Sequence, residues 1–338
     1  MKANYGLPLR AWLKEQCIEE IIDFGDLQVF QGATTYSCII RINKSTPHTS
    51  FEVTQVKTLT FQSLSDYAND NHYHVSQPNL DDKGWSLADE RTKNLLEKMN
   101  STGVPLSEYI DGRIYRGMLT GFDEAFIIDA KTREKLIAED VKSSELIKPH
   151  LAGRDIKRYQ SPNSGKYLIF TRRGINIQDY PAIEKHLLQF KERLMPKPKD
   201  WKGEVWNGRK PGAYKWYEVQ DAIDYYTEFD KPKITYLKFQ VKPAFTFDEE
   251  GHYPNSANWI IPSNDKYLLG IFNSKLGWFM ISNYCTQIQN GYQLIFDYLG
   301  KISIHAIDFS DSADAARHDR MVSLVDQMLS LHKQLQEA

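Results

Sequence analysis

The residues best suited to chemistry lie where cations alternate with aromatic rings. The stretch WKGEVWNGRKPGAYKWYE, residues 201–218, contains Trp206, Arg209, Lys210, Tyr214 and Lys215. Cations hold phosphates and can fork onto guanine, while aromatic rings stack on bases or wedge between base steps. We predict that these five residues contact DNA. Tryptophans are also common in protein cores, and lysines often only solvate a loop.

Other polar residues could join the same interface. Arg172 and Arg173 follow a predicted strand and could project two guanidinium groups from its end. Gln289 and Asn290 belong to an amide-rich cluster that could read adenine, although a capped turn explains the cluster nearly as well. We assign phosphate positioning to four more cations, Arg154, Lys157, Arg158 and Lys166.

The charge distribution supports this prediction. The chain has 42 Lys and Arg against 44 Asp and Glu, a net charge of -2. Residues 148–216 hold 16 basic and 6 acidic residues, so this segment is +10 and the remainder is -12. A polarised block of this kind creates a local positive field that suits a phosphate backbone. A solvated, salt-bridged surface is the alternative.

Motifs for catalysis or a bound metal are missing from the sequence. It contains no GxxxxGK[ST], no GxGxxG and no GxSxG, and its three cysteines are too few and scattered for a zinc cage. His72 and His74 could pair on a metal, but solvated loop histidines are more common. Asp248 and Glu250 favour a hairpin turn over a pair of catalytic carboxylates. We therefore predict no catalytic or metal-binding residue.

Composition limits the class of protein. With 41% hydrophobic and 25% charged residues, the chain is neither collagen-like, disordered nor a disulfide scaffold. It has no apolar run of the ~18 residues that a membrane span needs and no signal-peptide pattern, so we expect a cytoplasmic protein without membrane contact. A length of 338 residues predicts two or three domains.

Hydrophobic spacing predicts the elements that position these residues. In the first part of the chain we expect a helix from residue 7, strands at 19–24 and 36–42, an irregular connector at 44–88 with one strand near 51–60, and a helix at 87–100 opened by Ser86. Further on we expect a hairpin at 112–129, helices at 131–140, 181–194, 217–229 and 263–276, and strands at 166–173, 232–237 and 256–262. Residues 195–216 are expected to form a long loop. The first hairpin has open edges that need further strands, from this chain or another. Residues 311–338 form a helix whose Leu324, Met328, Leu331 and Leu335 make a heptad seam.

Several of these segments resemble a known family. The stretch IIDFGDLQVFQGATTYSCIIRI resembles the closing strands of the catalytic domain in adenine-N6 DNA methyltransferases of type IIG restriction–modification systems. Six later segments look like the TaqI-like C-terminal specificity domain of those enzymes and occur in the family order: GRIYRGMLTGFDEAFIID, IKPHLAGRDIKRY, YLIFTRRGINIQDYPAI, KWYEVQDAIDYY, PKITY and YLLGIFNSKL. The resemblance runs from about Leu7 to Leu335.

The resemblance implies a mixed α/β (α+β) fold with four parts. These are the last helix and strand pair of a methyltransferase sheet at 1–45, a connector with one helix at 46–105, a DNA target recognition (specificity) domain at 106–310, and a C-terminal packing helix at 311–338. The family binds S-adenosylmethionine at a glycine-containing strand end and holds the flipped adenine with Asn-Pro-Pro-Tyr. Neither motif is in this sequence.

The expected function follows from that difference. The resemblance implies sequence-specific recognition of double-stranded DNA, with S-adenosylmethionine and the catalytic residues supplied by a methyltransferase catalytic domain or subunit. We expect the chain to be a fragment, a truncated reading frame or one half of a split enzyme. One alternative is an interaction protein that docks on a full-length methyltransferase through its open hairpin and heptad helix. A metal-dependent nuclease using Asp248 and Glu250 is a weaker alternative.

Overall fold

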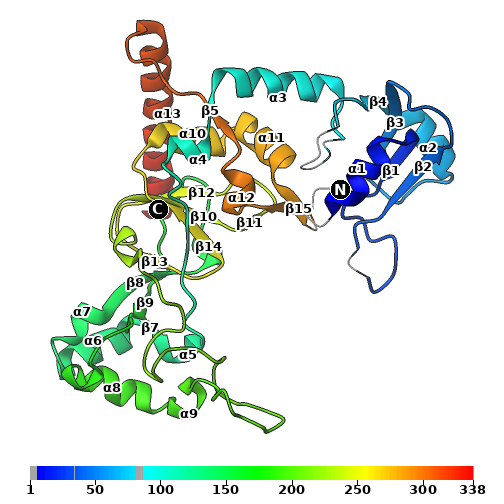
Figure 1. Cartoon of the computed structure of the whole chain (residues 1–338). Coiled ribbons are helices and arrows are strands. Elements are labelled where there is room, and N and C mark those ends of the chain that lie inside the picture. The colour runs from blue at the N-terminus through cyan, green and yellow to red at the C-terminus, as the bar shows by residue number, and fades with distance from the viewer. Residues whose placement is uncertain (1–5, 34, 81–84, 86, 289, 338) are drawn as a thin grey trace. The chain divides into compact units, whose positions relative to one another are not determined.

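The computed structural model describes every residue except 1–5, 34, 81–84, 86, 289 and 338, drawn as a grey trace in Figure 1. The chain divides into two compact units, each assembled from stretches far apart in the sequence. Unit 1 comprises residues 1–109, 239–242 and 275–306, and unit 2 comprises residues 110–238, 243–274 and 307–338. The fold is mixed α/β, as predicted. In the described part of the chain, no helix combines the length and apolar character that crossing a membrane requires.

The first part of unit 1 is a four-stranded sheet in the order β2-β1-β3-β4. Its elements are α1 (Leu7–Lys14), β1 (Cys17–Asp23), β2 (Cys38–Asn43), β3 (Ser50–Gln55), α2 (Leu64–Asn71) and β4 (Tyr73–Ser76). β1 pairs antiparallel with β2 and parallel with β3, and β3 pairs antiparallel with β4. The predicted helix and hairpin are confirmed, and β3 covers the second edge of β1.

Buried side chains from β1, β3 and the residues after β4 build the core of this sheet. Ile18, Ile21, Phe51, Val53 and Trp85 are buried together. Phe51 and Val53 follow the period of two of a strand, whereas Ile18 and Ile21 are three residues apart because the register of β1 shifts between Ile18 and Glu20. Residues 50–76 are expected from the sequence to be mostly irregular, with one strand. They instead form two strands of this sheet and a helix.

The rest of unit 1 consists of short elements. They are α3 (Glu90–Thr102), β5 (Val104–Pro105), α4 (Leu106–Tyr109), β11 (Phe239–Gln240), α11 (Lys275–Tyr284), β15 (Thr286–Ile288), β16 (Gly291–Gln293), α12 (Phe296–Leu299) and β17 (Ser303–Ile304). The predicted helix at 87–100 is α3, and Asp89 caps it by accepting a hydrogen bond from the Thr92 amide at 2.8 Å. The predicted cap, Ser86, lies outside the described residues.

Unit 2 contains two four-stranded sheets, in the orders β12-β10-β14-β6 and β13-β8-β9-β7. The strands are β6 (Tyr115–Arg116), β7 (Ile127–Asp129), β8 (Ile147–Leu151), β9 (Lys166–Ile169), β10 (Lys233–Leu237), β12 (Phe245–Asp248), β13 (Tyr253–Pro254) and β14 (Asn258–Ile261). The helices are α5 (Asp123–Phe126), α6 (Ala130–Glu139), α7 (Ser143–Leu146), α8 (Pro181–Leu188), α9 (Lys191–Leu194), α10 (Lys266–Asn273) and α13 (Ser312–Glu337). Phe126, Leu168, Leu187, Val219 and Ile260 share one buried core.

The C-terminal helix α13 packs along α10 (Figure 1). A Cβ added at Gly270 would lie 3.0 Å from both Met321 Sδ and Val325 Cγ2, so the glycine permits this close approach. The predicted heptad residues are exposed, from 37% at Met328 to 75% at Leu335.

The expected hairpin at 112–129 is wrong. β6 pairs with β14 and β7 pairs with β9, so the two strands belong to different sheets. The glycines that suggested a hairpin have other roles. A Cβ at Gly117 would lie 2.1 Å from the Asn255 carbonyl oxygen, and Gly121 has a φ of +85°.

The expected helix at 217–229 is also wrong. Its backbone amides bond to distant strands and loops, from Val219 to the Thr171 oxygen at 2.9 Å and from Gln220 to the Thr120 oxygen at 3.1 Å. These bonds replace the local bonds of a helix, and only a 3₁₀ turn at Tyr226–Glu228 remains. Similarly, the predicted helix at 263–276 begins later, capped by Asp265, and ends at Asn273.

Candidate nucleic-acid interface

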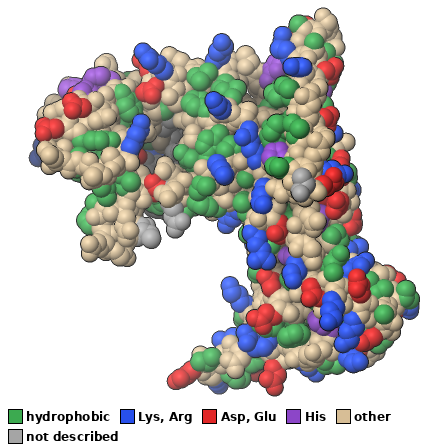
Figure 2. Space-filling model, turned by 180° about the vertical axis from the view of Figure 1, so that it is seen from behind, with side chains coloured by type: hydrophobic (Ala, Val, Ile, Leu, Met, Phe, Trp, Pro, Cys, Tyr) green, Lys and Arg blue, Asp and Glu red, His purple; other side chains and the backbone are tan. Residues whose placement is uncertain are grey.

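The polarised segment 148–216 lies entirely within unit 2, from β8 to the end of the long loop. Figure 2 shows Lys and Arg side chains interleaved with Asp and Glu over the part of unit 2 that holds α6 to α9. A net charge alone therefore does not locate a binding surface. Exposure and hydrogen bonding separate the cations that can meet a ligand from those that hold the fold.

A turn after β8 displays three of the predicted phosphate contacts. Arg154 belongs to the 3₁₀ turn Gly153–Asp155, and its side chain is 82% exposed. Lys157 is also exposed. Arg158 is exposed as a residue, but its guanidinium donates to the carbonyl of Asn273 and lies 5.2 Å from the Tyr159 ring centroid. Of these three cations, Arg158 is held by a backbone carbonyl, and Arg154 makes only a long contact, 3.9 Å, with the Asp155 carboxylate.

Lys166 and Arg172 flank β9. Lys166 opens the strand opposite Asp129 on β7, and its side chain is exposed. Arg172 follows the strand and is exposed, with its guanidinium 5.2 Å from the Tyr226 ring centroid. Both side chains are placed where a phosphate or a base edge could reach them.

Arg173 holds protein backbone instead of facing solvent. It is partly buried, and its guanidinium donates to the carbonyls of Val219 and Gln220. The Glu218 carboxylate lies 3.8 Å away. With these hydrogen bonds made, we reassign Arg173 from base contact to positioning the chain at 218–220.

Arg209 is the most buried of the predicted contacts, at 3% exposure. Its guanidinium donates to five backbone carbonyls, at Leu194 (2.8 Å), Thr120 (2.9 Å), Glu218 (2.7 Å), Lys215 (3.2 Å) and Trp216 (2.9 Å). Burial lowers its pKa to about 10, so it is still charged near neutral pH. All five donors of the fork are used, and we reassign this residue from DNA contact to holding the loop.

The remaining aromatic and basic predictions divide in the same way. Tyr214 is buried and donates its hydroxyl hydrogen to the Lys210 carbonyl. Trp206 is partly buried and donates from Nε1 to the Arg209 carbonyl at 3.1 Å. Lys210 and Lys215 are exposed, and a hydrogen bond with Tyr217 raises the pKa of Lys215. The aromatics therefore support the loop, and the two lysines face solvent.

The long loop at 195–216 is closed at its base. The Arg209 amide donates to the Met195 carbonyl at 2.9 Å, and the Lys197 amide donates to the Arg209 carbonyl at 3.0 Å. Residues 198–208 form an excursion between these two points, which we call the loop tip; Figure 1 shows it extending away from α9. Trp201 is 41% exposed and packs edge-on against Trp206, with ring centroids 5.0 Å apart.

The loop tip also carries exposed residues that sequence reasoning left unassigned, namely Lys199, Trp201 and Lys202. All three belong to the segment already recognised as basic and aromatic. The sequence did not indicate the backbone hydrogen bond between Arg209 and Met195, which closes the base of the loop and holds its tip in place. Such a tie joins residues far enough apart that no local motif marks it.

Of the two amide predictions, the structure describes one, which belongs to unit 1. Asn290 is exposed, in the turn between β15 and β16. Gln289 lies outside the described residues. Their predicted role in reading adenine stays a prediction.

The two carboxylates considered for a nuclease do not form a shared metal site in this geometry. Asp248 is fully buried, 2.6 Å from Lys233 Nζ and 2.8 Å from His252 Nδ1. Burial opposes its ionisation, but the His252 hydrogen bond and the Lys233 charge outweigh burial and hold the pKa of Asp248 below its ordinary value. Glu250, by contrast, is 68% exposed. Asp248 neutralises a buried lysine, and the nuclease alternative gains no support.

A family comparison identifies the part of the chain that contains these residues. Residues 148–304 match the family described as the TaqI-like C-terminal specificity domain. The similarity to this family covers that part of the chain. The match begins at the start of the polarised segment and includes all 13 DNA-contact predictions made from the sequence. The resemblance inferred from its motifs is confirmed.

Two relatives are named as a type II methyltransferase and as a type II restriction enzyme and methyltransferase. The chain is 29% identical over 175 residues to the type II methyltransferase M.MjaIV of Methanocaldococcus jannaschii, covering 47% of this chain and 53% of that protein. It is 23% identical over 380 residues to the type II restriction enzyme and methyltransferase RM.Eco57I of Escherichia coli, covering 100% of this chain and 37% of that protein. The chain thus spans about half of the first relative and less of the second.

One solved structure is similar in fold over most of the chain. The type IIL restriction-modification enzyme MmeI in complex with DNA aligns with a TM-score of 0.55 and 13% sequence identity. The alignment covers 94% of this chain and 39% of that chain. At this identity the likeness concerns the fold.

Proposed function

We propose that this chain recognises a specific sequence in double-stranded DNA for an adenine-N6 methyltransferase of a restriction–modification system. The observation that carries the proposal is the specificity-domain match at 148–304, which contains the +10 segment. An enzyme that flips a base out of a duplex must first locate its site, and this takes backbone clamps together with base-edge readers.

The exposed cations of unit 2 form the proposed phosphate contacts. Arg154, Lys157 and Lys166 remain from the sequence prediction. Lys210 and Lys215 join them beside the loop, and Lys199 and Lys202 at the loop tip. Neutralising ~6–10 phosphates makes affinity fall steeply with salt. The number of exposed cations in the segment is sufficient for such a clamp.

Base reading is assigned to residues that present planar or forked groups. Arg172 can fork onto guanine, and Trp201 at the loop tip can stack on a base or wedge beside one. Arg173 and Arg209 support these groups by fixing the backbone around them. Exposed side chains are thus assigned to base contacts, and buried or partly buried arginines to holding the backbone.

We propose that a methyltransferase catalytic domain or subunit is the protein partner and supplies S-adenosylmethionine chemistry. Unit 1 exposes large apolar residues on its first helix and second strand, including Leu9 (55%), Trp12 (50%) and Ile39 (46%). Exposed apolar clusters mark interaction sites. In unit 2 the heptad seam of α13 offers a second apolar stripe, ending in Leu331 and Leu335.

The proposal is tested by selecting duplexes from a random pool and measuring affinity for the selected site between low and moderate salt. We expect the affinity to fall linearly on logarithmic axes with a steep negative slope. The double variant Lys199→Ala/Lys202→Ala should lower affinity for all duplexes and reduce the magnitude of the slope by about 2.

A matched control uses the exposed lysines of unit 1. Lys44→Ala/Lys57→Ala removes the same charge outside the segment and should leave the slope unchanged. Failure to enrich any sequence, or affinity that does not depend on salt, would overturn the proposal.

A further inference from the structure

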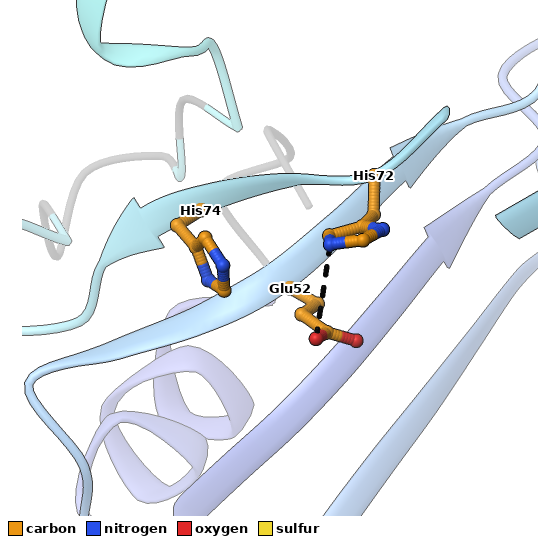
Figure 3. Close-up of side chains that lie close together, drawn as sticks. All are labelled: Glu52, His72 and His74. Atoms are coloured by element: carbon orange, nitrogen blue, oxygen red, sulfur yellow. Dashed lines mark ion pairs between the residues drawn. The ribbon is translucent and has the colours of Figure 1, made fainter. Parts of the chain in front are cut away.

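Two histidines and a glutamate, outside the residues 148–304 that match the specificity family, meet at the edge of the unit 1 sheet (Figure 3). Glu52 on β3 is the register partner of His74 on β4, and His72 ends α2 immediately before β4. Each side chain offers one ligand atom, and these three atoms lie within 4.8 Å of one another. Within the described residues this is the one such group of three.

The hydrogen bonding of His72 prepares it to be a metal ligand. Its Nδ1 lies 2.9 Å from the Asn69 carbonyl oxygen, and because a carbonyl only accepts, Nδ1 carries the hydrogen. In the neutral ring the lone pair is then on Nε2, which faces Glu52 Oε1 at 3.9 Å. A histidine that binds a metal characteristically donates its other ring hydrogen to a backbone carbonyl in this way.

His72 Nε2 and the Glu52 carboxylate are then two acceptors that face each other, and a cation between them would bind to both. A proton on His72 would satisfy Glu52 as a surface ion pair, which contributes little to stability. His74 adds a second imidazole on the same side of the two strands, with its ring centroid 5.7 Å from that of His72 (Figure 3). A protonated His72 would pair with Glu52 without His74, whereas a metal ion would use all three side chains as ligands.

The donor set indicates the class of ion. Two imidazole nitrogens and one carboxylate oxygen suit Zn²⁺ and its neighbours better than Ca²⁺ or Mg²⁺, which prefer oxygen ligands. Ligands about 2.0–2.2 Å from a tetrahedral zinc lie roughly 3.4 Å from one another. The three side chains are partly or fully exposed, so small rotations can close the remaining distance.

We propose that Glu52, His72 and His74 form a binding site for a divalent transition-metal ion of the Zn²⁺ type. Three protein ligands leave one tetrahedral position for water or an external ligand. The ion would tie strand β4, which borders the sheet, to its neighbour β3 and to the end of α2. Edge strands gain the most from such a link because they have one free side.

The test is titration of the purified full chain with Zn²⁺ in a calorimeter, supported by the absorption spectrum of bound Co²⁺. We expect one ion per chain, and about a tenfold or greater loss of affinity in His72→Gln and in His74→Gln. His48→Gln removes an exposed histidine of unit 1 outside the cluster and should leave affinity unchanged.

A second measurement avoids substitutions altogether. Side-chain ¹⁵N spectra of the unaltered chain should show the Nε2 resonance of His72 shifting when Zn²⁺ is added, while Nδ1 keeps its hydrogen. Absence of saturable binding, or binding that persists unchanged in the His72→Gln/His74→Gln double variant, would overturn the proposal. Because unit 1 alone supplies these ligands, the result is independent of whether the chain binds DNA.

Discussion

The guanidinium of Arg209 ties together three stretches of backbone, at residue 120, at residue 194 and at 215–218. We predict that Arg209→Lys lowers the free energy of unfolding by about 3 kcal/mol, because an ammonium cannot reach five carbonyls and leaves buried acceptors unpaired. Urea unfolding measures the change, with the exposed Lys210→Ala as control. An Arg209→Lys variant of full stability that has lost only DNA affinity would instead make Arg209 a DNA contact.

His150 and His186 make the stability of unit 2 sensitive to acid. Burial lowers the pKa of both, only partly opposed by hydrogen bonds to the carbonyls of Tyr253 and Ala125. Because the folded pKa lies below the unfolded value of about 6.5, their contribution is complete above that pH and is lost as pH falls toward the folded pKa. The free energy of unfolding should therefore decrease between pH 7.5 and 5.5.

The variant His186→Gln isolates part of this effect. Glutamine can still donate to the Ala125 carbonyl but does not titrate, so the loss of stability on acidification should be smaller than in the unaltered chain. His48→Gln, at an exposed position, serves as the control and should show the full loss. An identical pH response in His186→Gln would contradict the assignment.

Among the elements, those with strong local signals were predictable. The helices α6 and α13 and the strands β1, β2 and β10 follow from periodic apolar residues. The segment 217–229 has helical spacing too, yet its amides bond to the distant carbonyls of Thr120 and Thr171. Tertiary hydrogen bonds override local propensity there, and a single sequence does not contain that information.

The candidate site shows the same limit. A basic, aromatic segment could be recognised from residue types alone, and it lies within the residues that match the TaqI-like specificity family. Residue types could not separate Arg172, which is exposed, from Arg173 and Arg209, whose donors are spent on carbonyls. Arginine suits both tasks because the same planar fork binds phosphate, guanine or backbone oxygens.

For the molecule as a whole, the proposed function separates recognition in this chain from catalysis in another domain or subunit. The relatives named as methyltransferases are longer than this chain, which covers 53% and 37% of their lengths. The chain contains no Asn-Pro-Pro-Tyr and no GxGxxG. Exposed apolar residues in unit 1 and on α13 suit attachment to a further domain or subunit.

This division predicts that the chain alone binds its selected duplex but transfers no methyl group from S-adenosylmethionine. Co-expression with a catalytic domain that carries Asn-Pro-Pro-Tyr should yield N6-methyladenine in DNA containing that site, measured by mass spectrometry of the nucleosides. Lys199→Ala/Lys202→Ala should reduce methylation at limiting enzyme, because weaker phosphate contacts lower occupancy of the site. Methylation by the chain alone would place catalysis within it, and methylation by the complex at unrelated sequences would show that recognition lies elsewhere.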